Sequence, residues 1–134
     1  MTSKNIILED DYHCFICGKN NPFGLQLEFS FHNGKVISEF VLKKAHQGYK
    51  DIIHGGIISA ILDEAMVKTA LLQNMPAVTA EITIRFRNPL MVDEHALVEA
   101  FIEKNKKKII ETRSEIRKTD NTIIAEGYAK LIRV

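Results

Sequence analysis

The sequence predicts an α+β fold in which a curved antiparallel sheet of six strands wraps around one long central helix. Only one long segment, residues 57–72, carries apolar residues at helical rather than strand spacing, and it is apolar on nearly all sides, as a buried helix is. The segments before and after it alternate apolar and polar side chains, as strands do. One buried helix among successive strands is typical of a helix layered on a sheet.

Two strands are predicted before the helix. Residues 25–31 alternate apolar and polar side chains, as a half-buried strand does. Asn33-Gly34 follows, and this pair is a strong signal for a tight hairpin turn. Residues 35–42 alternate in the same way, so we expect them to return beside the first strand. A loop at residues 43–53 then leads to the helix.

The first strand after the helix has two different faces. We expect the helix to end near residues 73–75, because Pro76 cannot continue it. Residues 78–87 then alternate until Asn88-Pro89 stops the strand. If no bulge interrupts the alternation, one face carries Val78, Ala80, Ile82, Ile84 and Phe86, and the other carries Thr79, Glu81, Thr83, Arg85 and Arg87.

Three more strands are predicted at residues 96–103, 107–118 and 122–134, joined by turns at 104–106 and 120–121. The last strand carries small residues on one face, which would let the helix approach the sheet closely. These small residues are Ala125, Gly127 and Ala129.

Length, charge and the N-terminal sequence limit the kinds of protein to consider. The 134 residues fit one domain, and we expect a single unit over residues 1–134 with an N-terminal arm and loop at 1–24. A net charge of +1 argues against a nucleic-acid partner, since duplex binding usually requires a strongly basic face. The N-terminal residues resemble neither a secretion signal nor a membrane span. The sequence therefore predicts a cytoplasmic protein with no membrane partner.

Cys14 and Cys17 are the only cysteines. A zinc ribbon requires a second pair of ligands, and His13 and His32 do not supply the usual spacing. A redox pair of the thioredoxin type follows a strand and opens a helix, a context that is missing here. We therefore expect structural or idle thiols and predict no metal site.

Polar residues interrupt the apolar helix at three places, one of which is Lys68 near its end. His54, Gly55 and Gly56 stand at its start, and Asp63 and Glu64 lie in its middle. A carboxylate inside a buried helix costs several kcal/mol unless it is paired, hydrated or used in function. These two acids are therefore the first candidates for a functional site.

Motifs along nearly the whole chain match one known pattern. They are Cys14-Phe15-Ile16-Cys17-Gly18, Asn21-Pro22-Phe23-Gly24-Leu25, Gln47-Gly48-Tyr49, His54-Gly55-Gly56 with Asp63 nine residues after the His, and Arg87-Asn88-Pro89. With these motifs the chain resembles the hotdog-fold acyl-CoA thioesterases, in particular the PaaI-like branch of the phenylacetate pathway. The resemblance implies a hotdog fold and thioester hydrolysis with no cofactor apart from the coenzyme A of the substrate. It also implies self-association as a homodimer, or as a homotetramer built from two dimers.

The resemblance assigns roles to particular residues. In the family, the glycine-bearing helix start binds the thioester carbonyl and the acid nine residues after the His drives hydrolysis. Those positions here are Gly55, Gly56 and Asp63. Family members often have Ser or Thr ten residues before the strand-ending Pro, which matches Thr79.

One loop position departs from the family pattern. Some members have Asn six residues before the signature His, where this chain has Gly48, and Gln47 resembles the Gln of another branch. We expect these two loop residues to contact substrate and to influence which substrate is preferred.

The residue types suit this chemistry. A helix start offers unpaired N–H groups and a partial positive charge, and glycine lets a substrate approach the backbone, which makes Gly56 the predicted oxyanion donor. Asp63 would act as general base or as nucleophile. Seven residues at 1.5 Å each place Gly56 and Asp63 about 10 Å apart along the helix. We therefore expect each site to combine Gly56 of one chain with Asp63 of another, at a dimer interface with two sites.

Each candidate residue also has a purely structural interpretation. Asp63 would bind Thr79 or Lys68 without catalysis, and Thr79 would be an ordinary strand residue or would orient Asp63 or a water molecule. His54 would hold the loop by hydrogen bonds rather than act as a general acid. Glu64 lies about 100° around the helix from Asp63 and fits a salt bridge or a substrate channel. Arg85, Arg87 and residues 104–108 fit either CoA phosphates or ordinary surface charge.

Three functions remain open. The first is hydrolysis of a medium-chain or aromatic acyl-CoA to the free acid and CoA. The second is a non-catalytic protein that binds acyl-CoA or a fatty ligand. A hydroxyacyl dehydratase or hydratase ranks last, because its Asp-x-x-x-x-His motif is missing.

Overall fold

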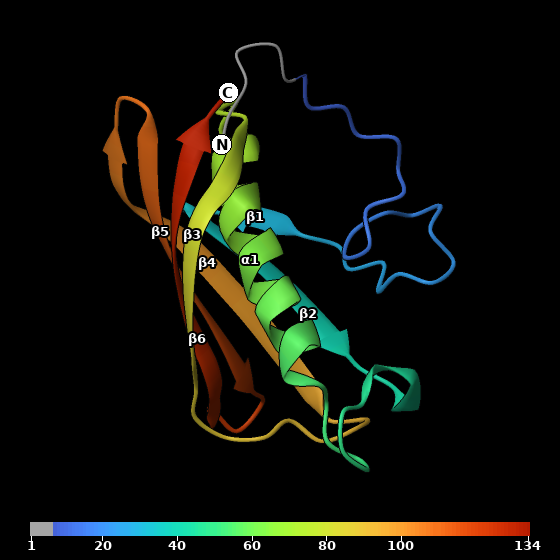
Figure 1. Ribbon diagram of the computed structural model, residues 1–134. Coiled ribbons are helices and arrows are strands. Elements are labelled where there is room, and N and C mark those ends of the chain that lie inside the picture. The colour runs from blue at the N-terminus through green and yellow to red at the C-terminus, as the bar shows by residue number, and fades with distance from the viewer. Residues whose placement is uncertain (1–6) are drawn as a thin grey trace.

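The computed structural model describes residues 7–134, which form six strands and one α-helix (Figure 1). Their bounds are β1 Ser30–His32, β2 Lys35–Val41, α1 Gly55–Leu71, β3 Ala77–Phe86, β4 His95–Lys106, β5 Ile109–Lys118 and β6 Ile123–Arg133, with a short 3₁₀ turn at Lys44–His46. This order confirms the predicted arrangement of two strands, a long helix and four strands. Among the described residues, no helix combines the length and apolarity needed to cross a membrane.

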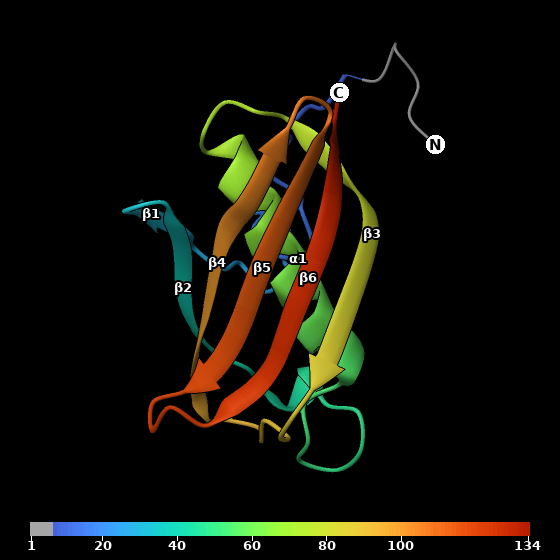
Figure 2. The same cartoon turned by 90° about the vertical axis from the view of Figure 1, so that its left-hand side faces the viewer.

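The six strands form one antiparallel sheet in the order β1-β2-β4-β5-β6-β3. β3 does not pair with β4, the next strand along the chain, but crosses the sheet to lie beside β6. It therefore forms one edge of the sheet, as Figure 2 shows. The sheet curves along α1, which contacts β2 to β6.

The helix is central because its side chains form much of the core. Ile61, Leu62, Ala65 and Met66 are fully buried against the sheet. Close packing is possible because β6 carries small residues, as predicted: a Cβ at Gly127 would lie 2.4 Å from Ser114 Oγ and 3.1 Å from Met66 Cε. The helix ends before Pro76, as expected, with Asn74 in the left-handed region at φ 61°.

The predicted strand at residues 25–31 is wrong over most of its length, since only Ser30 and Phe31 of that range belong to β1. The backbone of this segment bonds to the N-terminal arm instead. Leu25 N–H donates to Phe15 O at 2.9 Å, and Leu27 N–H donates to Ile16 O at 2.8 Å. Gln26 adopts φ 53°, which breaks the extended conformation between these two bonds.

A bulge in β3 overturns the predicted alternation of residues 78–87. The pairing of β3 with β6 shifts between Thr79 and Glu81, so Ala80 is an additional residue without a partner of its own. Thr79 consequently faces α1, although the uninterrupted pattern placed it on the face of Arg85. A second bulge lies between Ile102 and Lys104. β4 continues beyond it to Lys106, so the next turn is at residues 107–108 and not at the predicted 104–106.

Candidate active site

The start of α1 is capped by the side chain of His54. The residue has extended backbone angles, φ −60° and ψ 132°, and its Nδ1 accepts a hydrogen bond of 2.8 Å from Gly56 N–H. Its own N–H donates to His46 O at 2.9 Å, which fixes the loop before the helix. Because Nδ1 accepts, the neutral ring carries its proton on Nε2. His54 therefore acts as an N-cap, in agreement with the structural interpretation of this residue.

This cap changes which helix amide is available to a substrate. Ile57 and Ile58 N–H both donate to His54 O, at 3.0 and 3.2 Å, and Gly56 N–H is held by the His54 ring. No acceptor for Gly55 N–H is found among residues 7–134. The structure thus holds the predicted donor, Gly56, in a cap, and leaves the neighbouring Gly55 amide at the mouth of the helix.

Both glycines are exposed, and Gly55 lines a cavity. A Cβ at Gly55 would stand 3.5 Å from the Phe86 ring, and one at Gly56 would stand 3.0 Å from His54 Nδ1. The cavity has a volume of about 360 Å³. It is lined mainly by apolar side chains, namely Ile52, Ile53, Ile58, Phe86, Pro89, Leu90 and Ile124, together with Gly55, Arg87 and Asn88. Its lining comes from α1, the loop before it, the end of β3 with the residues that follow, and β6, so no single sequence motif predicted it.

Asp63 is tied to β3 by Thr79. The Thr79 hydroxyl donates a hydrogen bond of 2.6 Å to Asp63 Oδ1, and both residues are half-buried. The hydroxyl holds one carboxylate oxygen and fixes the orientation of the other. The structure therefore brings together two residues that the sequence analysis proposed for the site, 16 positions apart in the chain.

Asp63 and the glycines do not meet within one chain. They share one side of a regular helix, but the rise of 1.5 Å per residue separates Gly56 from Asp63 by about 10 Å. A group bound at the helix mouth is therefore out of reach of the carboxylate of the same chain.

The loop residues predicted to contact substrate lie next to the helix mouth. Gln47 Oε1 accepts a hydrogen bond of 2.9 Å from Asp51 N–H and so stabilises the loop. A Cβ at Gly48 would stand 3.4 Å from His54 Cα, so a side chain at this position would point at the cap. The structure places both residues beside His54, and their contact with substrate stays a prediction.

Glu64 faces away from this site. Its Oε2 atom accepts from Cys14 Sγ at 3.5 Å and lies 3.9 Å from Lys68 Nζ. Burial and the neighbouring Glu64 carboxylate raise the pKa of Cys17 to about 12. Glu64 thus joins α1 to the N-terminal arm, whereas Asp63 contacts Thr79 of β3.

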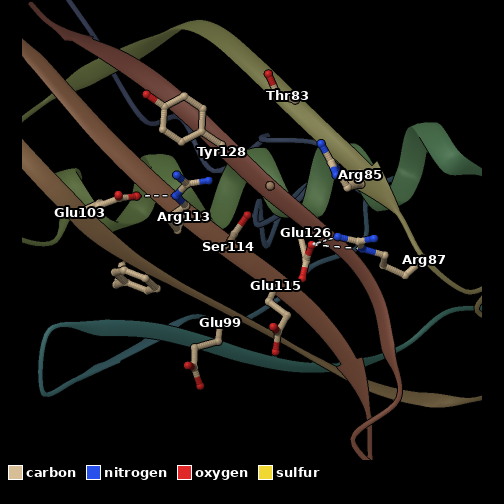
Figure 3. A pocket seen from close by; sticks show the side chains of 12 residues that line it. Thr83, Arg85, Arg87, Glu99, Glu103, Arg113, Ser114, Glu115, Glu126 and Tyr128 are labelled. Atoms are coloured by element: carbon tan, nitrogen blue, oxygen red, sulfur yellow. Dashed lines mark hydrogen bonds and ion pairs between the residues drawn. The ribbon is translucent and has the colours of Figure 1, made fainter.

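Arg85 and Arg87 lie in a groove of about 770 Å³ on the outer face of the sheet (Figure 3). Arg87 forms an ion pair with Glu126 at 3.0 Å, and Arg113 pairs with Glu103 and lies 4.5 Å from the centre of the Tyr128 ring. The structure separates Arg85 from the glycines, whereas Arg87 also lines the cavity beside Gly55.

Paired charges dominate this outer groove. Burial raises the pKa of Glu99, but hydrogen bonds from Lys35 and Arg117 outweigh it, so this pKa lies below its ordinary value. Since Arg87 and Arg113 already have carboxylate partners, the groove offers few basic groups to a phosphate.

Comparison with known proteins identifies the family and the fold. A family model described as the thioesterase superfamily matches residues 50–125, which include α1 and most of the sheet. No curated protein sequence gives a significant match.

Solved structures resemble the chain at low sequence identity. Zebrafish thioesterase superfamily member 2 has a TM-score of 0.78 at 17% identity, covering 91% of each chain. The E. coli PaaI protein from the phenylacetic acid degradation operon has a TM-score of 0.77 at 20% identity, over 82% of this chain and 80% of its own. The smu.793 protein of Streptococcus mutans UA159, solved with acetyl CoA, has a TM-score of 0.76 at 16% identity, over 81% and 88%. These likenesses confirm the hotdog fold.

Proposed function

This chain belongs to the thioesterase superfamily, and from that premise we propose that it hydrolyses acyl-CoA thioesters to a free acid and CoA. The observation that carries the proposal is the pair formed by Asp63 and Thr79, on the same side of α1 as the glycines at its start. A structural neighbour bound to acetyl CoA and the likeness to the E. coli PaaI protein support CoA thioesters as the substrate class.

The proposed chemistry uses an amide at the helix start and the carboxylate of Asp63. As general base, Asp63 removes a proton from water, and the resulting hydroxide attacks the thioester carbon. As nucleophile, the carboxylate attacks the thioester carbon directly; loss of the CoA thiolate leaves an anhydride between the acyl group and Asp63, which water then hydrolyses to the free acid and Asp63. In both routes negative charge builds on the carbonyl oxygen, which Gly55 N–H would stabilise, or Gly56 N–H after His54 releases it. The carbon–sulfur bond then breaks, and the CoA thiolate leaves and takes up a proton.

A second chain would complete each site. β3 is an edge strand of ten residues with half-exposed apolar side chains, Ile82 at 39% and Phe86 at 56% exposure, which suits pairing with another copy. Within one helix, Asp63 lies about 10 Å from Gly56. A twofold dimer would instead bring Asp63 of one chain close to Gly55 and Gly56 of the other. A homotetramer would add a further contact between such dimers.

The cavity beside Gly55 supports an acyl group of moderate size. Its volume of about 360 Å³ and its apolar lining suit a medium-chain or aromatic acyl group. Arg87 lines the same cavity, and its guanidinium would contact a CoA phosphate only by exchanging its present partner, Glu126, for the phosphate. Gln47 and Gly48 border the helix mouth from the loop side. We assign no metal or additional cofactor to the hydrolysis.

Thiol release from a panel of acyl-CoA esters tests this function. We expect turnover of medium-chain or aromatic members, and a loss of about 100-fold or more in kcat for Asp63→Asn, which keeps the shape of the side chain and removes its charge. Thr83→Val is a control, since Thr83 lies on β3 but faces the outer groove. Equal activity of Asp63→Asn and the wild type would reject the mechanism.

Mixed dimers test the shared site. Asp63→Asn and Gly55→Ala chains, each weakly active alone, would regain about a quarter of wild-type activity after statistical mixing, because half of the dimers carry one site without either substitution. No recovery, although exchange of chains is demonstrated, would place both groups in one chain.

One observation favours the binding-protein alternative. The hydrogen bond from Gly56 N–H to His54 Nδ1 occupies a donor on which the hydrolytic mechanism draws. Saturable binding of an acyl-CoA without thiol release from any panel member would support this alternative over hydrolysis.

A further inference from the structure

Three potential metal ligands meet where the N-terminal arm crosses α1. They are Cys14 Sγ, Cys17 Sγ and the carboxylate of Glu64, whose ligand atoms all lie within 4.8 Å of one another. The two thiols come from the arm, whereas Glu64 stands in the helix, 50 residues from Cys14 along the chain. Figure 1 shows the arm on the side of α1 that faces away from the sheet. All three residues are partly buried.

The turn that carries the two cysteines is shaped for sulfur ligands. Ile16 N–H donates to Cys14 Sγ at 3.4 Å, which holds this sulfur in place within the turn. Gly18 N–H donates to Cys14 O at 2.9 Å and closes the turn. A Cβ at Gly18 would stand 2.4 Å from Cys14 N and 2.5 Å from Cys14 O, so only glycine fits directly after Cys17. The Cys-x-x-Cys-Gly motif therefore forms a tight turn with both sulfurs close to Glu64.

The spacing of these atoms fits a tetrahedral metal centre. Zinc binds thiolate sulfur at about 2.3 Å and carboxylate oxygen at about 2.0 Å, which sets the edge between two such ligands of a tetrahedron near 3.5 Å. Cys14 Sγ and Glu64 Oε2 are 3.5 Å apart. We propose that Cys14, Cys17 and Glu64 form a binding site for a thiophilic divalent cation, Zn²⁺ in the first place, with water as the fourth ligand.

The surroundings supply an entry route and a balancing charge. Cys17 lines a surface cavity of about 390 Å³, through which an ion and its water ligand can enter. Two thiolates and one carboxylate exceed the charge of Zn²⁺ by one, and Lys68 Nζ lies 3.9 Å from Glu64 Oε2. Binding turns two thiols into thiolates and releases two protons to solvent. The raised pKa of Cys17 adds to a strong dependence of affinity on pH.

The site would fasten the arm to the core. Over residues 7–29 the structure has no strand or helix, and of the arm's apolar residues Ile16 and Leu27 are buried. A metal centre would add a cross-link between this weakly anchored segment and α1. No metal site was predicted from the sequence, because no second pair of ligands follows at the usual spacing. Glu64 lies far from the Cys-x-x-Cys motif along the chain, and only the fold brings it near.

Cobalt and zinc binding to the full-length chain test this proposal. After removal of bound metal under reducing conditions, we expect one Co²⁺ per chain with an absorption band from thiolate-to-cobalt charge transfer, which Zn²⁺ abolishes by displacement. Cys14→Ser and Cys17→Ser should each weaken this band. Glu64→Gln should lower zinc affinity roughly tenfold or more, whereas Asp63→Asn, which removes a neighbouring helix carboxylate, should change it less than about twofold. Zinc should also raise the Tm of the wild type but not of the Cys17→Ser variant.

Two results would overturn the proposal, and both are measured on the unmodified chain. The first is the absence of a thiolate charge-transfer band at saturating Co²⁺ although both thiols titrate as reduced. The second is purification of the chain with a disulfide between Cys14 and Cys17 that reforms after reduction in the presence of zinc. Because metal binding is measured without substrate, a failure here leaves the proposed hydrolysis intact, and the converse also holds.

Discussion

The Thr79 hydroxyl donates a hydrogen bond of 2.6 Å to Asp63 Oδ1, and it reaches the carboxylate because β3 bulges directly after Thr79. Without Ala80 as an additional residue, Thr79 could not share the helix-facing side of β3 with the apolar residues beyond the bulge. Ile84 is one of these residues. A Cβ placed on Gly127 would lie 3.4 Å from Ile84 Cδ1 and 3.1 Å from Cε of Met66 in the helix, so Ile84 faces the helix. The bulge thus serves both the core and the candidate site.

Replacement of Thr79 tests whether catalysis requires the orientation that this residue gives to the Asp63 carboxylate. Thr79→Val keeps the shape of the side chain but leaves a half-buried carboxylate oxygen without its donor, so we expect a loss of about 1–2 kcal/mol in the free energy of unfolding and roughly tenfold in kcat. Thr79→Ser keeps the hydroxyl and should retain most of both. Urea unfolding and thiol-release rates measure the two effects. A Thr79→Val enzyme as active as the wild type would show that this hydrogen bond is structural only.

Deletion of Ala80 should disrupt the site more than any substitution of that residue. Removing the bulge forces one part of β3 to change face, which either turns Thr79 away from Asp63 or turns Ile84 out of the core. We expect a loss of about 3 kcal/mol or more in stability, comparable to the removal of a buried apolar side chain, together with loss of activity. Ala80→Gly keeps the residue count and should stay close to wild type in thermal unfolding. A stable, active deletion variant would show that the bulge has no role.

Residue periodicity predicted the helix and the order of the strands, but not the local irregularities that form the site. The apolar run at residues 57–72 and the alternating segments around it carry strong signals because each repeats over many residues. Periodicity could not predict the bulge at Ala80, because apolar and polar residues alternate through 78–87 without interruption. At residues 25–31, alternation predicted a strand although the backbone bonds there go to the arm.

The sequence predicted most of the site residues but not the contacts that they make. The sequence pointed to His54, Gly56 and Asp63 as a group, and the fold places all of them on or beside α1. It could not show that His54 Nδ1 holds Gly56 N–H, because capping depends on a side-chain rotamer and a loop angle. Nor could it show that Glu64 turns to Cys14, since that contact joins two segments distant in the chain.

Removal of the cap should cost stability without removing the oxyanion donor. His54→Ala deprives Gly56 N–H of its acceptor, and the loss of an N-cap typically costs about 0.5–2 kcal/mol. His54→Asn replaces one capping side chain with another and should recover most of that stability. If His54 serves only as a cap, His54→Ala should keep kcat within about threefold of the wild type at a temperature where it is folded. A loss of 100-fold in both variants would instead assign the imidazole a chemical role.

The two glycines should respond differently to alanine. A methyl group at Gly55 meets the Phe86 ring at an ordinary 3.5 Å, and alanine favours helix over glycine, so Gly55→Ala should fold at least as well as the wild type. The same methyl group would cover the amide at the helix mouth, and we expect kcat/KM to fall at least tenfold. At Gly56 the methyl group would stand 3.0 Å from His54 Nδ1, so Gly56→Ala should disturb the cap and lower Tm. Thermal unfolding and steady-state kinetics distinguish the two, and unimpaired kinetics of Gly55→Ala would remove that amide from the mechanism.

The Cys17 thiol should resist alkylation in the folded, metal-free chain. Burial and Glu64 raise its pKa from 9.0 to about 12. At a pH between these two values, the thiol is protonated in the folded state and ionised in the unfolded state. The corresponding stabilisation is therefore complete below pH 9.0 and declines as the pH rises toward 12. At pH 8 the thiolate is the reactive form, and we expect iodoacetamide to modify Cys17 roughly 100-fold or more slowly than in urea. Mass spectrometry of the Cys17 peptide measures this rate in the presence of a chelator, and Glu64→Gln should raise it because the negative charge beside the thiol is removed. Equal rates in the folded and unfolded chains would contradict the packing of Cys17 against Glu64.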